Sequence, residues 1–330
     1  MTGPPFRWMQ PVLWLLPGAA MLGAGIGAFM AWRDLRGGGL GKSTCEPASC
    51  DPGDRQRESR AFAPPRMRSR PSAAVRPSDE SHATRRPDPE PPMKRLTRDW
   101  FYVAMAAITL LAIAVGFGRT YAAPMVAGTF HGPMALHVHG AFALGWVLLF
   151  LAQPLLVRGR RIAAHRRVGR IGFPLAVGVA VTMVPAGVHQ VTRDLADGVG
   201  EEAVSAMVCV VTSAVMFVVL VACGIVARRD REAHARWLLL ATLLVAWPAW
   251  FRWRHWFPSV PRPDIWFGVV IPDSWILIAM LRDRITRGGV HPVLGIAGSA
   301  IVLENWFEVL AFDTQPWRDV AHAIYGWLHP

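Results

Sequence analysis

The chain has 330 residues, of which 52% are hydrophobic, and its formal net charge is +12. Its charges are clustered in short loops and one long linker, and apolar runs of about 18 to 23 residues separate them. This pattern is typical of a multi-spanning membrane protein and argues against two or three soluble domains. The positive charge does not indicate nucleic-acid binding, because no DNA- or RNA-binding motif accompanies it. The predicted fold class is therefore all-α, a polytopic transmembrane helical bundle whose main partner is the lipid bilayer.

The first 92 residues differ in character from the rest. Residues 1–32 contain an apolar run over 11–32, which predicts an extra N-terminal transmembrane span. Residues 33–92 are rich in Pro, Arg, Ser, Asp and Glu, and this composition predicts a disordered linker. A basic flank and a new apolar run begin at Met93. We therefore expect the functional unit to begin there.

The segment 93–311 is predicted to be a membrane domain of seven core spans. Every second loop between them is rich in arginine, which indicates the cytoplasmic side. With the N-terminus of this domain inside, seven spans put the C-terminus outside, in a multi-pass protein of a bacterial inner membrane. The predicted spans are 100–120, 135–157, 171–191, 203–227, 237–256, 265–281 and 289–311. A further segment, 312–330, has apolar residues at helical spacing and predicts an amphipathic helix on the outer surface.

Polar side chains within apolar spans are costly and therefore mark candidate sites. At the outer end of the bundle the sequence places His137, His139, His189, Arg252, Arg254, Glu304, Asn305 and Glu308. His137 and His139 lie about 200° apart around a helix, so only one of them can face the bundle interior. His139 shares its face with Gln153, a deep polar residue, and is favoured over His137. Glu304 and Glu308 are four residues apart and share one face.

Asp273 lies in the middle of the sixth predicted span, directly after Pro272. The proline removes a backbone donor and leaves a carbonyl free, and a carboxylate at this depth is expected to be protonated or paired. At the inner end, His165 and His234 lie in basic loops. The favoured interpretation is that these two histidines anchor the loops at the membrane surface.

Three chemistries fit these residues. Haem b could be ligated by His139 and His189, with Arg252 and Arg254 pairing with its propionates, and a second haem by His165 and His234. A divalent metal could be held by His139, His189, Glu304 and Glu308, as in a metal-dependent membrane hydrolase; the resemblance to ceramidases and adiponectin receptors is only architectural. A proton-coupled transporter could use Asp273, Glu304 and Arg252 as its relay.

The favoured hypothesis is a haem- or metal-binding redox protein with its site at the outer face. The transporter and the hydrolase are the alternatives, and a non-catalytic structural or assembly role is the remaining one. Whether the chain is an enzyme, and which redox partner or small-molecule substrate it takes, is left open by the sequence.

The run from His137 to Gly172 and the later run from Glu232 to Trp253 resemble a family of uncharacterised bacterial multi-spanning inner-membrane proteins. The residues that carry the resemblance are His139, Gln153, the loop motif His165-Arg166-x-x-Gly169-Arg170, His234, Arg236 and Arg252. The resemblance covers roughly residues 93–310. It implies a seven-helix inner-membrane protein, and it implies no established activity.

Overall fold

A computed structural model of the chain describes residues 99–329. Within this range every regular element is a helix. The predicted extra span in 1–32 and the predicted linker 33–92 lie outside the described residues. The α-helices are α4 Phe101–Phe117, α5 Ala123–Val126, α6 Met134–Arg158, α7 Ile162–Gly169, α8 Gly172–Ala196, α9 Glu202–Val226, α10 Arg231–Val245, α11 Trp247–Phe251, α12 Pro263–Ile265, α13 Ile271–Arg287, α14 Ser299–Ala311 and α15 Gln315–Leu328. Short π-helical segments are η1 Gly118–Ala122, η4 Trp266–Val270 and η5 Val293–Gly298, and the 3₁₀ segments are η2 Ala227–Arg229 and η3 Arg252–His255.

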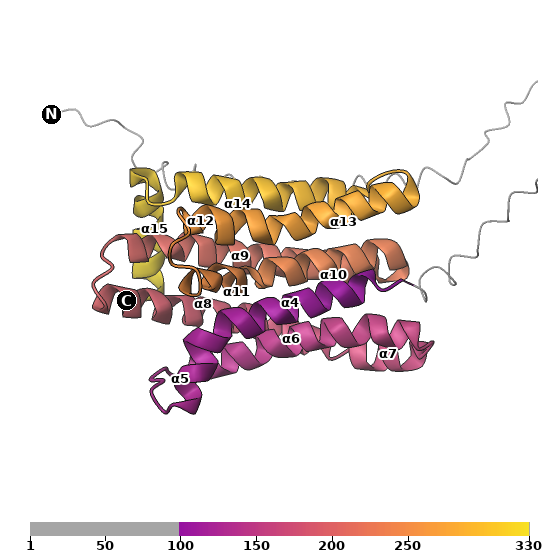
Figure 1. Cartoon of the computed structure of the whole chain (residues 1–330), viewed down its shortest axis with the longest axis horizontal. Coiled ribbons are helices and arrows are strands. Elements are labelled where there is room, and N and C mark those ends of the chain that lie inside the picture. The colour runs from indigo at the N-terminus through magenta and orange to yellow at the C-terminus, as the bar shows by residue number, and fades with distance from the viewer. Residues whose placement is uncertain (1–98, 330) are drawn as a thin grey trace, which may run out of the picture.

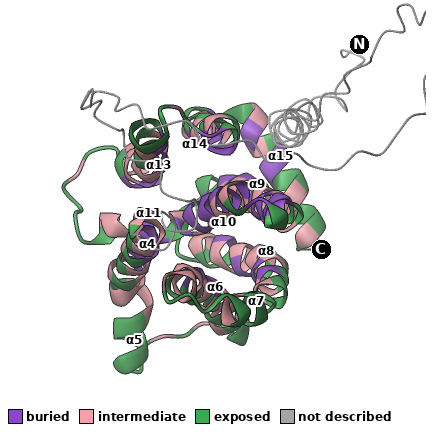
Figure 2. Cartoon of the chain, turned by 90° about the vertical axis from the view of Figure 1, so that its right-hand side faces the viewer, coloured by how far each residue is buried: buried purple, intermediate pink, exposed green. Residues whose placement is uncertain are grey.

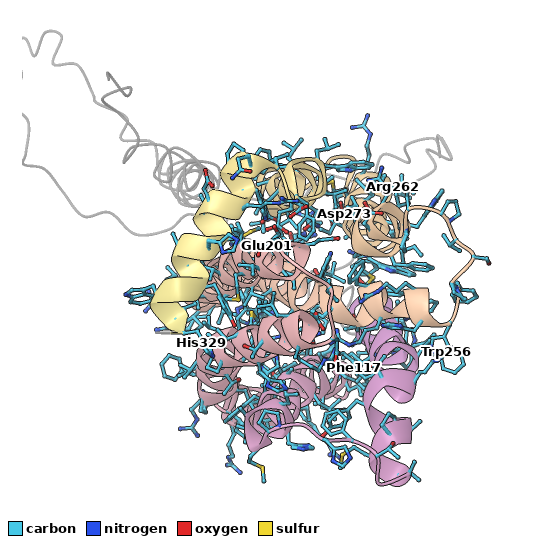
Figure 3. The ribbon with its side chains drawn as sticks, turned by 90° about the vertical axis from the view of Figure 1, so that its left-hand side faces the viewer. Phe117, Glu201, Trp256, Arg262, Asp273 and His329 are labelled. Atoms are coloured by element: carbon cyan, nitrogen blue, oxygen red, sulfur yellow. The ribbon has the colours of Figure 1, made fainter. Side chains whose placement is uncertain are left out.

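The long helices lie side by side along the longest axis of the molecule, and α15 lies across one end (Figure 1). One end of the bundle carries the loops around Arg160, Arg229 and Gly288, and is called the arginine-loop end. The other carries Trp253, Trp256 and Trp266, and is called the tryptophan end. Figure 3 faces the tryptophan end, with Trp256 labelled.

Six helical segments are long and apolar enough to cross a membrane, as judged by their length and composition. Each overlaps one of the predicted spans. Together they make the described part of the chain compatible with a multi-pass membrane protein. Their bounds are Phe101–Val126, Met134–Arg158, Ile162–Ala196, Glu202–Arg229, Pro263–Arg287 and Val293–Ala311.

The predicted span 237–256 is not a continuous helix. α10 ends at Val245, and α11 and η3 follow after a turn at Ala246. Pro248 explains the interruption, because it has no N–H to donate to the carbonyl of Leu244 one turn earlier. The segment is therefore not among the six, although α10 and α11 lie within the bundle (Figure 1).

α10 is the most deeply buried helix of the bundle. Leu239, Leu240 and Ala241 are consecutive and wholly buried, so the helix is covered by protein on every face rather than on one. Figure 2 shows this helix beside α9 near the centre, with exposed surface on the helices around them. The indole of Trp146 on α6 donates to the Thr242 hydroxyl of α10 over 3.1 Å, which ties the outer layer to the centre. The apolar residues of α10 are therefore part of the protein core formed with the surrounding helices.

Arginine–carboxylate contacts connect the helices at the arginine-loop end. The Arg236 guanidinium of α10 donates to both oxygens of Asp283 on α13, over 2.8 and 2.6 Å, and both side chains are buried. The backbone N–H of His291 donates to the same carboxylate over 3.2 Å. Arg282 pairs with Asp99 beside it. A buried charge pair of this kind is tolerated because the fork geometry and the added N–H satisfy the carboxylate.

α15 packs on protein at the tryptophan end. Its buried residues Trp317, Val320 and Ala321 belong to the apolar face expected from the sequence, and they contact α9. The Trp317 indole donates to the carbonyl of Ser205 over 2.9 Å. Trp327, expected on the same face, is 81% exposed. The helix therefore covers the end of α9 with only part of the predicted face.

Gly116 lets α4 approach α11 closely. A Cβ atom placed on Gly116 would overlap the backbone oxygen of Ala249, and a backbone oxygen cannot move aside as a flexible side chain can. Gly118, two residues later and also in right-handed helical conformation, has open space around it. Gly118 can therefore serve as a control position for Gly116.

We expect Gly116→Ala to lower the free energy of unfolding of the purified protein by about 1–3 kcal/mol, because the added methyl group overpacks the interface between α4 and α11. Gly118→Ala should leave stability unchanged or slightly raised, because alanine favours a helix. Thermal unfolding in an uncharged detergent measures both. Equal melting temperatures for the two variants would contradict the close approach of α4 and α11.

Candidate functional site

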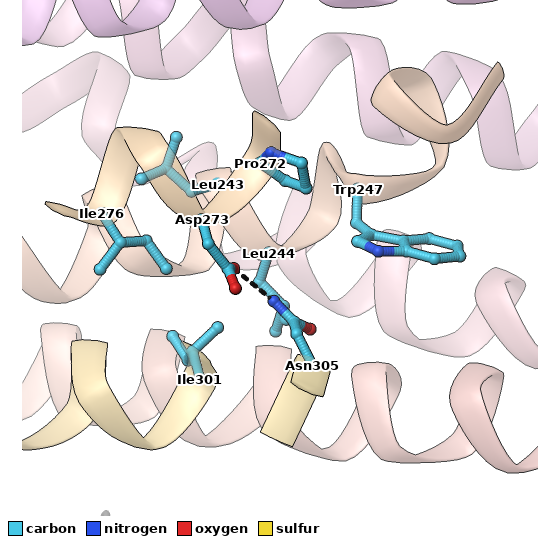
Figure 4. A pocket seen from close by; sticks show the side chains of 8 residues that line it. All are labelled: Leu243, Leu244, Trp247, Pro272, Asp273, Ile276, Ile301 and Asn305. Carbon is cyan, nitrogen blue, oxygen red and sulfur yellow. Dashed lines mark hydrogen bonds between the residues drawn. The ribbon is translucent and has the colours of Figure 1, made fainter. Parts of the chain in front are cut away.

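Asp273 and Asn305 form a buried polar pair between α13 and α14. The Asn305 amide donates to Asp273 Oδ1 over 2.6 Å, and the two residues are 4% and 8% exposed. The other oxygen, Asp273 Oδ2, has no hydrogen-bond partner within residues 99–329. Figure 4 shows the pair from close by. A carboxylate with one unsatisfied oxygen is costly in such surroundings, so it needs either a proton or a further partner.

The backbone around Asp273 departs from a regular α-helix. The π-helical segment η4 precedes it, and Pro272 supplies no N–H. The carbonyl of Gly268, four residues before Pro272, accepts a hydrogen bond from the Trp247 indole of α11 over 2.5 Å. The carbonyl expected to be free is therefore capped by a side chain. This contact fixes the segment that carries Asp273 against α11.

A small cavity lies against the pair, about large enough for one water molecule. Its lining residues come from α10, α11, α13 and α14, and Figure 4 shows them. They are Leu243, Leu244, Trp247, Pro272, Asp273, Ile276, Ile301 and Asn305. The walls are mostly apolar, and Asp273 is the only ionisable group among them. The cavity gives this carboxyl group room to exchange a proton with water.

A second pair of carboxyl groups lies on the neighbouring face of α14. Glu304 is 4% exposed, and its Oε1 has no partner among the described residues. Glu304 and Glu308 are one helical turn apart and act on each other electrostatically, and two ionised carboxylates in this arrangement would repel. The Thr212 hydroxyl of α9 lies 2.5 Å from Glu308 Oε1.

Thr212 has one hydroxyl proton and three acceptors within reach. Besides Glu308, these are the carbonyls of Val208 and Cys209, each 3.1 Å away. The hydroxyl can therefore donate to an ionised Glu308 or, when it bonds to its own helix, accept a hydrogen bond from a protonated Glu308. The group Asp273, Asn305, Glu304, Glu308 and Thr212 is called the carboxyl cluster below.

The predicted outer residue His139 is oriented by a hydroxyl group of α8. Its Nδ1 lies 2.9 Å from Thr182 Oγ1, and the same hydroxyl lies 2.6 Å from the carbonyl of Gly178. When the hydroxyl donates to Gly178, Nδ1 of His139 carries the proton and Nε2 is an acceptor; when it donates to Nδ1, the proton of the imidazole is on Nε2. Arg252 lies within electrostatic range of His139, so these two predicted residues are brought together.

His189 shares a face of α8 with Thr182, the partner of His139, but not its depth. Seven residues separate Thr182 from His189, which corresponds to about 10 Å along a helix. Arg193 lies one turn further and within electrostatic range of Arg252. His139 and His189 were expected at equal depth. The Thr182 contact instead places His189 nearer the tryptophan end, which is unfavourable for two axial ligands of one haem.

The other predicted histidines are each held by a neighbour. His137 Nδ1 lies 2.6 Å from the Tyr121 hydroxyl. His165 and His234 interact electrostatically at the arginine-loop end, so the structure brings them together. His234 Nδ1 donates to the carbonyl of Gly224 over 2.7 Å. With the oxygen and nitrogen of its amide group exchanged, which satisfies both atoms, Gln153 donates to His165 Nδ1 over 2.5 Å.

The predicted metal ligands His139, His189, Glu304 and Glu308 do not form a group. Within residues 99–329 no three His, Cys, Asp or Glu side chains lie close enough to hold a metal ion. The contacts of these residues explain the difference: Glu308 faces Thr212 of α9, whereas His139 faces Thr182 of α8. The predicted metal set therefore has no support in the described structure.

Sequence reasoning did not identify two residues of the site. Thr212 is one of a few hydroxyl side chains in the apolar helix α9, beside Ser213, and nothing in the sequence singles it out. Trp247 is one of several tryptophans near the end of the fifth predicted span, and nothing in its sequence context links it to Gly268. No known family, curated protein or solved structure matches this chain. The resemblance to an uncharacterised membrane-protein family accordingly stays a prediction.

The Trp247 contact can be tested by Trp247→Phe, which keeps the ring that stacks on Phe251 but removes the indole N–H. The Gly268 carbonyl then has no donor, and we expect stability to fall by about 1–3 kcal/mol. Trp327→Phe, at an exposed position, is the matched control and should change nothing. If Trp247→Phe has the same melting temperature as wild type, the indole N–H does not compensate for the backbone N–H that Pro272 lacks.

Proposed function

We propose that the protein is a proton-coupled membrane transporter in which Asp273 takes up and releases the coupled proton. The observation that carries this proposal is the buried Asp273 carboxyl group, with one oxygen bonded to Asn305 and the other unpaired beside a water-sized cavity. Such a group can change its protonation state without breaking a salt bridge. Intramembrane carboxyl groups with this freedom are typical of proton relays.

The rest of the carboxyl cluster supports the same function. Glu304 lies within electrostatic range of both Glu308 and Asp273. Uptake of a proton at one carboxyl group therefore changes the affinity of the other for its own proton. The π-helical segments η4 and η5 lie in the two helical segments that carry Asp273 and Asn305, and such segments are common at functional sites.

The proposed membrane topology has seven spans, the seventh being the interrupted α10–α11 segment. Its burial among the other helices supports this, since a bundle helix covered by protein can be broken where a lipid-facing one cannot. The arginine-loop end is assigned to the cytoplasm by its charge, in a bacterial inner membrane, and the tryptophan end and C-terminus to the outside.

A second candidate function is haem ligation by His139. The observation that favours it is the contact of Nδ1 with Thr182, which orients the ring; with the Thr182 hydroxyl donating to Gly178, Nδ1 carries the proton and Nε2 is able to bind iron. An absorption spectrum of protein produced with haem supplied would test this candidate. A Soret band lost in His139→Ala supports it, and a spectrum without a Soret band excludes it.

The transport function is tested in proteoliposomes that contain a pH-sensitive dye. An imposed pH gradient drives protons into the vesicles, and a panel of small oxyanions such as phosphate and carboxylates is added as candidate co-transported solutes. We expect a transported solute to speed up proton entry in wild type. Asp273→Asn should abolish this proton entry. Asp273→Glu, which restores a titratable group, should retain part of the flux. The matched control is Asp264→Asn, which removes an exposed carboxylate that pairs only with Arg262.

Two results would contradict the proposed function. One is a wild-type protein that moves no protons with any solute of the panel. The other is a flux that Asp273→Asn leaves unchanged. Thermal unfolding of each variant shows whether a lost flux reflects lost folding.

A further inference from the structure

Arginine side chains crowd one part of the tryptophan end. Arg252 and Arg254 come from η3, Arg119 from η1 and Arg193 from the last turn of α8. All four lie within electrostatic range of His255. The group Arg119, Arg193, Arg252 and Arg254 is called the outer arginine cluster. Figure 3 faces this end, where Phe117 and Trp256, the ring partners of two of these arginines, are labelled.

Three members of the cluster have no carboxylate partner among the described residues. Arg252 donates to the carbonyl of Pro248 over 2.9 Å, Arg254 to that of Phe251 over 3.0 Å, and Arg119 to that of His255 over 2.6 Å. Each guanidinium group has five N–H donors, so most of them remain for water or a ligand.

Three arginines elsewhere in the described chain are paired with carboxylates. Arg236, Arg262 and Arg318 donate to Asp283, Asp264 and Asp313 respectively, with two N–H groups each. Arg119, Arg252 and Arg254 differ from these three in having no carboxylate partner among the described residues. A group of uncompensated cations repels itself and is stabilised by an anion.

Aromatic rings hold the guanidinium groups in place. Arg252 lies over the ring of Phe117 at 4.4 Å, Arg254 over Phe251 at 3.9 Å and Arg119 over Trp256 at 5.6 Å. Stacking of this kind fixes the plane of a guanidinium group while leaving its N–H edge available. The arginines are thus oriented before any ligand arrives, which lowers the entropic cost of binding.

The nearby acidic residue Asp194 does not neutralise the cluster. It is the one described carboxylate that acts electrostatically on both Arg252 and Arg254. Both of its oxygens already accept from the Gln190 amide, over 2.7 and 2.8 Å, and Arg193 pairs with it at 3.2 Å. Arg193 pairs with Asp197 as well, at 3.8 Å. The other three arginines of the cluster therefore face one carboxylate that is already engaged.

We propose that the outer arginine cluster is a binding site for an oxyanion, namely a phosphate or carboxylate group, held mainly by the N–H edges of Arg252 and Arg254. Guanidinium groups match the two oxygens of such a group. The same chemistry is offered by a free oxyanion and by the phosphate of a lipid headgroup. The assignment of this anion as the transported solute rests on the proposed function, whereas the binding itself does not.

Binding is tested with the purified full-length chain in an uncharged detergent, titrated calorimetrically with inorganic phosphate. We expect saturable binding by wild type, at least tenfold weaker binding by the double variant Arg252→Gln/Arg254→Gln, and only partial recovery by Arg252→Lys/Arg254→Lys, which restores the charge but not the fork of N–H donors. The matched control Arg262→Gln, which alters an exposed arginine already paired with Asp264, should bind within twofold of wild type. Binding is measured without a proton gradient or any transport, so that loss of transport and loss of binding are distinguished.

A second arm separates the two sources of the anion. Native mass spectrometry compares retention of phosphatidylglycerol by wild type and by the double glutamine variant. Lipid retention that depends on the two arginines, without phosphate binding, assigns the site to a headgroup; phosphate binding assigns it to a free oxyanion. The proposal is overturned when neither ligand binds, or when a folded double glutamine variant binds both as wild type does.

Discussion

The absence of water from a bilayer interior is the constraint on which this structure depends, because every backbone group there needs a partner within the protein. Pro272 breaks that rule locally by removing one N–H from α13. The Trp247 indole supplies the replacement by donating to Gly268, and in doing so fixes α11 against the start of α13. At the other interruption Pro248 is itself exposed, whereas its neighbours Ala246, Ala249 and Trp250 are buried. Of the two prolines, Pro272 is the buried one, and it creates the irregular backbone beside Asp273.

Two buried polar sites of opposite character lie at different depths. At the arginine-loop end, Asp283 has both oxygens occupied by Arg236 and accepts a further N–H from His291. Such a pair holds helices together, and losing either partner leaves an uncompensated charge. Asp273, by contrast, has one neutral partner, and its other oxygen has none within residues 99–329. A group that can be stable with or without a proton is suited to proton transfer, whereas a complete ion pair is suited to anchoring.

The membrane-spanning helices were predictable from the sequence, because an apolar run of about twenty residues matches the length of helix that crosses a bilayer. It was less informative for 237–256, where Pro248 interrupts a helix that protein covers. Asp273 was identifiable from local sequence, because a carboxylate directly after a proline is unusual within an apolar run. Its partner Asn305 and the contact of Thr212 with Glu308 depend on how α9, α13 and α14 are rotated about their axes, and one sequence contains no such information. For the same reason the four predicted metal ligands, which come from three helices, could not be tested before their facing directions were known.

The central claim is that Asp273 changes its protonation state in the folded, membrane-embedded protein. Infrared difference spectra between high and low pH, recorded for reconstituted wild type and for Asp273→Asn, measure this most directly. The account predicts a carboxylic-acid C=O band that appears as the pH falls, disappears as it rises and is missing from the variant. A band that is identical in the two proteins, or one that belongs to Asp273 but does not respond to pH, would contradict it.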